Sequence, residues 1–155
     1  MALEDITAFI RLDDGTGLSG MPTADQCREV KQAGYERVVN LAPEDSPSAL
    51  PAEPAIWAEL GLDYTNIPVA WSNPTRADLD SFIAQMEQSR GRSVFVHCVA
   101  NLRVTAFYAI YAVEKLGWPR DRALALIDRV WSRQPQYSQD PVWAAFIADN
   151  LRSRA

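Results

Sequence analysis

The chain alternates short apolar runs with longer segments in which apolar positions recur every three or four residues. The apolar runs predict four strands, at 6–12, 35–41, 62–69 and 93–98. Helical spacing predicts six helices, at 22–34, 52–61, 75–90, 102–117, 119–131 and from 141 onward. The stretch "DDGTGLSG" at 13–20 is rich in turn residues and is expected to be a loop.

Three of the predicted helices carry a signal at their start. Thr23 is followed three residues later by Gln26, which is the spacing of a capping box. Thr75 can cap the helix in which Asp78 places an acid in the first turn, and Asp140 precedes the helix that begins at a proline. This last helix is expected to bury one apolar face, made of Val142, Trp143, Phe146, Ile147 and Leu151.

The order of these elements predicts the fold class. Strands that alternate with helices, followed by three helices in a row, indicate an α/β protein with a central, mostly parallel sheet covered by helices on both faces. The 155 residues are expected to form a single domain, 1–155, with a sizeable core.

Composition narrows the classes of partner and compartment. A net charge of −5 disfavours nucleic acid or an anionic membrane as the main partner. The longest apolar run, 106–113, is too short to span a bilayer, and "MALEDITAF" has no basic segment typical of a signal peptide. Two cysteines form no disulfide framework and no repeated metal-ligand spacing, so we expect free thiols in a reducing cytoplasm and no metal.

The segment "VFVHCVANLR" carries the candidate chemistry. Cys98 ends a predicted buried strand, and a helix begins a few residues later. Ligands bind at the carboxyl ends of strands in open α/β sheets, and the free N–H groups of a helix start favour a thiolate. Arg103 is expected to curl back over the loop, where its planar guanidinium suits a tetrahedral oxyanion. The segment therefore predicts an anion cradle with a nucleophile at its floor.

Four segments in this order resemble one enzyme family. They are "SGMPT" before the first helix, "VVNLAPE", "GLDYTNIPV" and "VFVHC" with its following arginine. Together they resemble the cysteine-dependent protein tyrosine phosphatases of the dual-specificity type, and more narrowly the small bacterial phosphatase-like proteins of that superfamily. The resemblance implies a phosphatase fold, no cofactor, and substrates that carry a phosphate group.

The resemblance also implies a role for each residue of the loop. Cys98 would attack phosphorus and form a cysteinyl-phosphate that water then cleaves. Arg103 and the loop N–H groups, from Val99, Ala100, Asn101, Leu102 and Arg103, would stabilise the phosphoryl oxygens. His97 points away from Cys98 along a strand and would support the loop from behind.

The loop departs from the family pattern in three ways. Four residues separate Cys98 from Arg103, where the family has five. The loop has no glycine, so Asn101 is the residue best able to adopt a left-handed conformation. Val104 stands where the family has a hydroxyl residue that stabilises the departing thiolate, and Thr105 follows one position later as the candidate supporting hydroxyl.

The family's general acid has no counterpart at the expected place. The loop after the third predicted strand, 70–74, contains no carboxylate. The remaining candidates are Asp78, which is better explained as a helix-start residue, and Glu44 and Asp45 in another loop. Trp71 either forms a wall of the site or belongs to the core.

Three functions follow from these residues. The first is hydrolysis of phosphate monoesters, with phosphoprotein-type substrates; the second is a phosphate- or sulfate-binding pseudophosphatase without turnover. The third is a rhodanese-like sulfurtransferase, because those enzymes also have four residues between cysteine and arginine. Cys27 is expected to lie in the core, and a redox link to Cys98 stays open, as does the oligomeric state.

Overall fold

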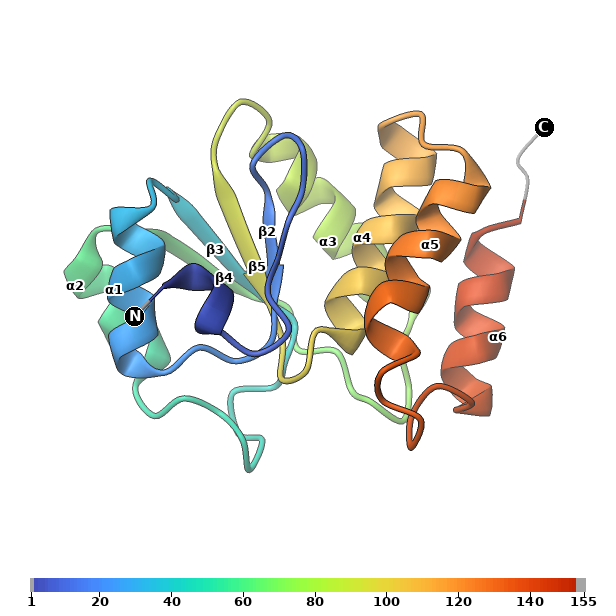
Figure 1. The fold of residues 1–155 in the computed structure, drawn as a ribbon, viewed down its shortest axis with the longest axis horizontal. Coiled ribbons are helices and arrows are strands. Elements are labelled where there is room, and N and C mark those ends of the chain that lie inside the picture. Colours follow the sequence, from blue (N-terminus) through green and yellow to red (C-terminus); the bar gives the residue numbers. More distant parts are fainter. Residues whose placement is uncertain (1, 153–155) are drawn as a thin grey trace.

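A computed structural model describes residues 2–152, and its centre is a five-stranded sheet of order β1-β2-β5-β3-β4 (Figure 1). Strand β1 is antiparallel to β2, and all other neighbours are parallel. Helices pack on both faces, which confirms the expected α/β class. The elements are η1 (Leu3–Asp5), β1 (Ile10–Arg11), β2 (Gly17–Ser19), α1 (Ala24–Gln32), β3 (Arg37–Asn40), α2 (Glu53–Leu60), β4 (Asp63–Asn66), α3 (Arg76–Gln88), β5 (Val94–His97), α4 (Leu102–Lys115), α5 (Arg120–Trp131) and α6 (Pro141–Asn150).

The N-terminal part of the sheet differs from the sequence prediction. The strand expected at 6–12 is reduced to Ile10–Arg11, and a short 3-10 helix precedes it. Strand β2 lies within the stretch expected to be a loop. Its residues, Gly17, Leu18 and Ser19, have little strand propensity of their own, and they become a strand by pairing with Phe95, Val96 and His97 of β5.

Two separate clusters of buried side chains cover the two faces of the sheet. One contains Val38 and Phe95 and is closed by η1, α1 and α2. The other contains Val39 and Val96 and is closed by α3 and α4, with α5 and α6 packed outside α4 (Figure 1). Because successive strand residues face opposite sides, Cys98 joins the α3–α4 side, while the preceding residue faces the α1–α2 side.

The predicted helix starts are confirmed. Thr23 and Thr75 each form a capping box, with Gln26 and Asp78 respectively, and the Asp140 side chain accepts hydrogen bonds from the first N–H groups of α6. The predicted buried face of α6 was partly wrong. Trp143 and Leu151 are buried, and Phe146 and Ile147 are partly buried, but Val142 is 44% exposed.

Between residues 2 and 152, no helix combines the length and the apolar character needed to cross a membrane.

The cap of α3 gives a first prediction. Replacing Thr75 by Ala removes the hydroxyl that accepts from the Asp78 N–H, at 3.0 Å, and should lower the free energy of unfolding by about 1 kcal/mol. Urea denaturation measures this loss. Thr75→Ser, which keeps the hydroxyl, should stay within about 0.5 kcal/mol of the wild type; equal losses for the two variants would contradict the capping role.

Candidate functional site

Cys98 lies directly after β5, at the carboxyl end of the central strand, and is 1% exposed. Cys98 borders a cavity of about 260 Å³, which is formed by four segments distant in sequence. The lining residues are Ser46, Pro47, Ser48, Trp71, Cys98, Val99, Ala100, Leu102, Arg103 and Tyr137. The predicted cysteine, arginine, loop and Trp71 are thus brought to one place.

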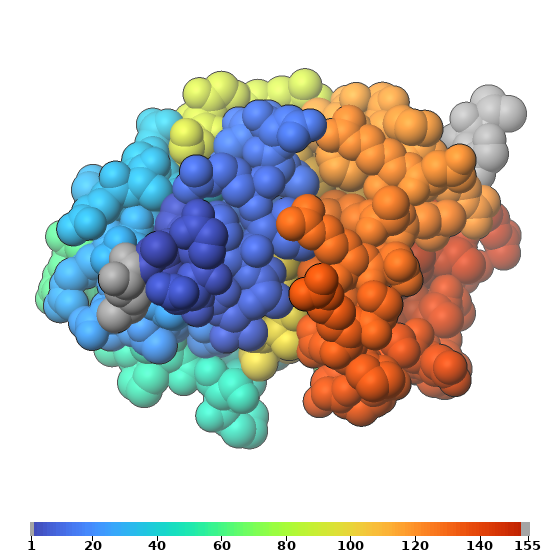
Figure 2. All heavy atoms as spheres, in the orientation of Figure 1, coloured from blue at the N-terminus to red at the C-terminus, as the bar shows by residue number. Residues whose placement is uncertain are grey.

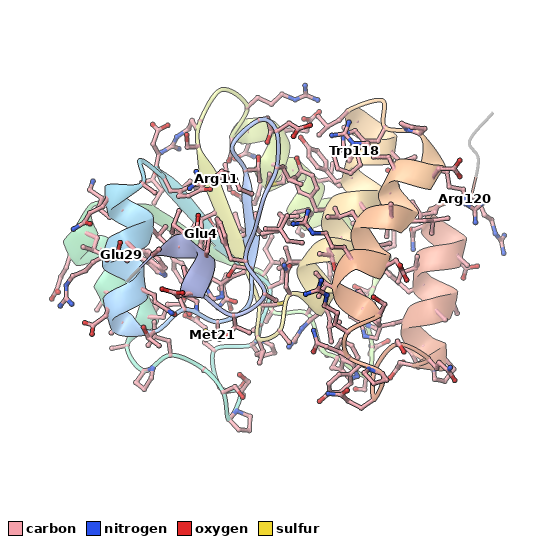
Figure 3. All side chains as sticks on the ribbon, in the orientation of Figure 1. Glu4, Arg11, Met21, Glu29, Trp118 and Arg120 are labelled. Carbon is pink, nitrogen blue, oxygen red and sulfur yellow. The ribbon has the colours of Figure 1, made fainter. Side chains whose placement is uncertain are left out.

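The loop after Cys98 directs its carbonyl groups away from the cavity's centre by bonding them elsewhere. The Val99 carbonyl accepts from the Met21 N–H at 2.9 Å, and Figure 3 labels Met21 beside the N-terminal segment. The Ala100 carbonyl accepts from the Gln134 side chain at 3.1 Å, and the Leu102 carbonyl from the Trp131 indole at 3.1 Å. These bonds hold the backbone of the loop from outside.

The loop N–H groups are left available as donors. Within residues 2–152, the backbone N–H groups of Val99, Ala100, Leu102 and Arg103 have no acceptor. In a trans peptide the N–H points opposite to the preceding carbonyl, so a carbonyl held outward turns the next N–H inward. The loop can therefore present donors to an anion above Cys98, although it is one residue shorter than the family loop.

Asn101 supplies the conformation that a glycine would otherwise provide. Its φ is 65° and its ψ is 13°, the left-handed region expected for it from sequence. The Asn101 side chain donates to the Ala8 carbonyl at 2.8 Å, which ties the loop to the N-terminal segment. In Figure 2 the yellow atoms near residue 100 are visible between that blue segment and the orange α5. The loop is thus held by the N-terminal segment on one side and by the segment after α5 on the other.

Arg103 is anchored at one end of its guanidinium. Nη1 donates to the Val69 carbonyl at 2.8 Å, and Cζ lies 6.0 Å from the centre of the Trp71 ring. The residue is 9% exposed and borders the cavity. The remaining N–H groups of Arg103 make no bond to residues 2–152, so they can meet an oxyanion in the cavity.

Trp71 is both a wall of the cavity and part of the core. Its ring stacks on Trp131 and Trp143, with centroids 5.8 and 5.1 Å away, and meets Tyr137 edge-on at 5.4 Å. The Trp143 indole donates to the Trp71 carbonyl at 2.7 Å. The sequence left open whether Trp71 lines the site or belongs to the core, and in the structure it does both.

Other expected site residues lie outside the cavity. The Thr105 hydroxyl donates to the Asn101 carbonyl at 2.8 Å, within the first turn of α4. Asp78 accepts from the Thr75 N–H in its capping box, and Glu44 accepts from the Tyr64 hydroxyl at 3.1 Å. Asp45 lies beside the lining segment but does not border the cavity. Among residues 2–152, no carboxylate lines the cavity.

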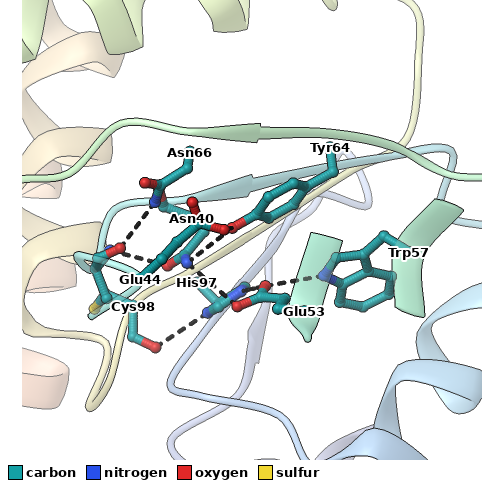
Figure 4. Close-up of polar contacts among 9 residues, drawn as sticks. Asn40, Glu44, Glu53, Trp57, Tyr64, Asn66, His97 and Cys98 are labelled. Carbon is teal, nitrogen blue, oxygen red and sulfur yellow. Dashed lines mark hydrogen bonds and ion pairs between the residues drawn. The ribbon is translucent and has the colours of Figure 1, made fainter. Parts of the chain in front are cut away.

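His97 points to the opposite face of the sheet, as its position in β5 predicts, and ends in a buried polar network (Figure 4). Nδ1 lies 3.1 Å from the Cys98 carbonyl oxygen, and Nε2 lies 2.5 Å from Glu53 Oε2. Asn40 and Trp57 also bond to Glu53. Sequence reasoning missed Glu53, because an acid in the first turn of a helix is ordinary and nothing in the local pattern indicates burial.

Cys27 is in the core, as expected. It is fully buried among α1, α2 and Phe95, and burial, followed by the negative charge of Glu53, raises the pKa of its thiol to about 12. Cys98 belongs to the cluster on the other face of the sheet. The structure therefore does not bring the two cysteines together. In the same described range, no cluster of three or more metal-ligating side chains is present.

Solved structures similar to this chain include a putative phosphatase. No family model matches the chain. A putative phosphatase (DUF442) from Shewanella putrefaciens CN-32 is 33% identical with a TM-score of 0.83, and the alignment covers 96% of this chain and 91% of that one. TpbA from P. aeruginosa has a TM-score of 0.69 at 19% identity, covering 93% of this chain and 88% of that one, and so shares the fold.

The curated relatives are longer. A "Beta-lactamase hydrolase-like protein" of Xylella fastidiosa (strain Temecula1) is 30% identical over 121 residues, which make up 76% of this chain. The chain spans about 28% of the length of the curated relatives it matches.

Gly20 provides a test of the loop geometry. A Cβ at this position would lie 2.5 Å from the Val99 carbonyl oxygen and 3.0 Å from that of Thr7, both backbone atoms. Gly20→Ala should therefore displace the loop and weaken binding of inorganic phosphate about tenfold or more, an effect of ~1.4 kcal/mol measurable by calorimetry.

Gly91→Ala is the matched control. Gly91 has a φ of 84°, so alanine there is also strained, but nothing lies within 4 Å of the new Cβ. Its phosphate affinity should equal that of the wild type. Unchanged affinity in Gly20→Ala would show that the loop does not form the anion site.

Proposed function

We propose a phosphoryl-transfer reaction at Cys98 for this chain, which belongs to the cysteine-dependent protein tyrosine phosphatase superfamily, dual-specificity type. The observation that carries the proposal is the meeting of Cys98, the unpartnered loop N–H groups and the Arg103 guanidinium at one cavity. A nucleophile, a cation and several backbone donors in that arrangement fit a phosphate monoester dianion.

The reaction has two displacement steps at phosphorus. The Cys98 thiolate attacks and forms an S–P bond, while the P–O bond to the leaving group breaks and its electron pair leaves with the oxygen. Water then attacks phosphorus, releases inorganic phosphate and regenerates the thiolate. The Arg103 guanidinium and the unpartnered N–H groups of the loop stabilise the charge on the three equatorial oxygens in both steps. These N–H groups belong to Val99, Ala100, Leu102 and Arg103.

The lining of the cavity narrows the class of phosphate ester. No carboxylate in the described range borders the cavity, so the leaving oxygen departs without a side-chain acid beside it. Aryl oxygens, which are weak bases, leave most easily under that condition. Trp71 and Tyr137 offer aromatic walls that suit an aryl ring. Among phosphoprotein groups, phosphotyrosine therefore fits the site better than phosphoserine.

A second candidate is a binding module that holds phosphate or sulfate without turnover. The same lack of a lining carboxylate favours it, together with Val104 at the position where the family has a hydroxyl.

Sulfur transfer is the third candidate, favoured by the four-residue loop. The Cys98 thiolate would take the outer sulfur of thiosulfate, releasing sulfite and leaving a persulfide, which an acceptor thiolate then removes. This chemistry needs no general acid at an ester oxygen, so the carboxylate-free lining is also compatible with it.

Hydrolysis of aryl phosphates tests the proposal. The wild type should hydrolyse p-nitrophenyl phosphate at least about 100-fold faster than an alkyl phosphate such as phosphoserine, because only the first leaves without an acid. Cys98→Ser should lower kcat by at least about 1000-fold. Cys27→Ala, which alters the other thiol, should leave kcat unchanged.

The alternatives give different outcomes in the same samples. Phosphate binding without turnover of any ester by the wild type would contradict hydrolysis and support the binding module. Mass spectrometry after thiosulfate treatment would reveal sulfur transfer as one added sulfur atom on Cys98. Cys98→Ser should gain no sulfur atom after the same thiosulfate treatment.

A further inference from the structure

The acid–base pair behind the loop is the strongest polar feature that the proposed reaction does not use. His97 and Glu53 side chains are 0% and 3% exposed, and Nε2 lies 2.5 Å from Oε2. Burying two ionisable groups is costly unless each is paired and hydrogen-bonded. The contacts around the pair determine which atom carries each proton.

Most groups that contact the Glu53 carboxyl can act there only as hydrogen-bond donors. The Ala42 N–H donates to Asn40 Oδ1 at 2.9 Å, so the Asn40 amide nitrogen faces Glu53 Oε1 and the Tyr64 hydroxyl. The Trp57 indole N–H donates to Glu53 Oε2 at 2.9 Å. Both carboxyl oxygens therefore accept from groups that can only donate there, as an ionised carboxylate does.

His97 is then held as a double donor. Nδ1 faces the Cys98 carbonyl oxygen at 3.1 Å, and only a protonated nitrogen can bond to a carbonyl. Nε2 faces the Glu53 carboxylate, so it is a donor as well. An imidazolium and a carboxylate form a neutral pair whose positive end lies next to the Cys98 peptide (Figure 4).

The direction of the Cys98 carbonyl has a consequence for the cavity. The bond from His97 holds this carbonyl on the α1–α2 side of the sheet. The Cys98–Val99 peptide is trans, so the Val99 N–H points to the opposite side, which is the side of the Cys98 side chain. His97 thus sets the orientation of the first donor of the loop.

We propose that Glu53 is a positioning residue: it keeps His97 a double donor, and His97 turns the Val99 N–H toward the cavity and places a cationic ring behind Cys98. The inference rests on the proposed function in taking Cys98 as the nucleophile. It assigns a role to a residue of α2 on the far side of the sheet from the reacting atoms.

Few other titratable groups face this site. On the α1–α2 side, burial raises the pKa of Tyr64 above its usual range, so the hydroxyl stays a donor to Glu44. Cys27 of α1 has its pKa raised to about 12, chiefly by burial, and so stays a thiol. On the cavity side, Arg103 of α4 is the charged residue among those that line the cavity.

Glu53→Gln is the sharpest substitution, because an amide cannot satisfy all three donors. With its oxygen toward Trp57 and His97, its NH₂ group opposes the Asn40 amide. With its nitrogen there, the NH₂ group opposes the Trp57 indole. In both orientations His97 loses the negative partner that stabilises its charge.

The test is the rate of Cys98 alkylation by iodoacetamide, followed by mass spectrometry from pH 6 to 9. Glu53→Gln should react about tenfold more slowly than the wild type at pH 6.5, because the charged ring behind the Cys98 peptide is lost. Affinity for inorganic phosphate should fall about tenfold as well, because the Val99 N–H is no longer held in place.

Trp57→Phe is the matched control, since it removes one donor from the same carboxylate but leaves the Glu53–His97 bond. Its alkylation rate and phosphate affinity should stay within twofold of the wild type. Equal slowing in Trp57→Phe and Glu53→Gln would assign Glu53 a structural role only and overturn the proposal. Wild-type rates in Glu53→Gln would overturn it too.

A measurement on the unaltered protein covers the case in which Glu53→Gln does not fold. His97 is the single histidine of the chain, so its ring nitrogens give one assignable pair of ¹⁵N signals. At pH 7 both should have the chemical shifts of protonated nitrogens; an unprotonated Nε2 would overturn the proposal. Alkylation and NMR do not require turnover, so failure of ester hydrolysis would contradict the proposed function and leave this inference standing.

Discussion

Strand β5 lies in the middle of the sheet, between β2 and β3, and the successive residues His97 and Cys98 face opposite sides. A central strand has both edges hydrogen-bonded, so its direction and register are held from two sides. The cavity with its loop then forms on one face, and the buried polar network forms on the other. The arrangement separates the cavity that Cys98 borders from the polar network around His97.

The hydrogen-bond donors that the loop offers to the cavity depend on where its carbonyl groups are bonded. Donors from three other segments, Met21, Gln134 and Trp131, hold those carbonyls outward. A loop without glycine can thereby still offer its N–H groups to an anion, because Asn101 takes the one left-handed conformation that is needed. Among the described residues, no carboxylate lines the cavity that this loop borders.

The sequence was sufficient for the elements whose signals are local. The junction at Cys98, the capping residues Thr23 and Thr75 and the conformation of Asn101 all depend on residues close together in the chain. Strand β2 could not be predicted, because it is a strand only where β5 pairs with it. The contact between Glu53 and His97 was equally inaccessible, since the two residues are 44 positions apart along the chain and meet only after folding.

The contact between Asn101 and Ala8 has a consequence for how the protein is made. The two residues are 93 positions apart. Ala8 has a φ of 52°, a strained backbone conformation for alanine that persists only where surrounding contacts offset the strain. Ala8 precedes Asn101 in the chain, so during synthesis the Ala8 carbonyl lacks this donor until residue 101 has been made. A chain that ends before Gln134 would still contain Cys98, but its loop would lack the bond that Gln134 donates to the Ala100 carbonyl.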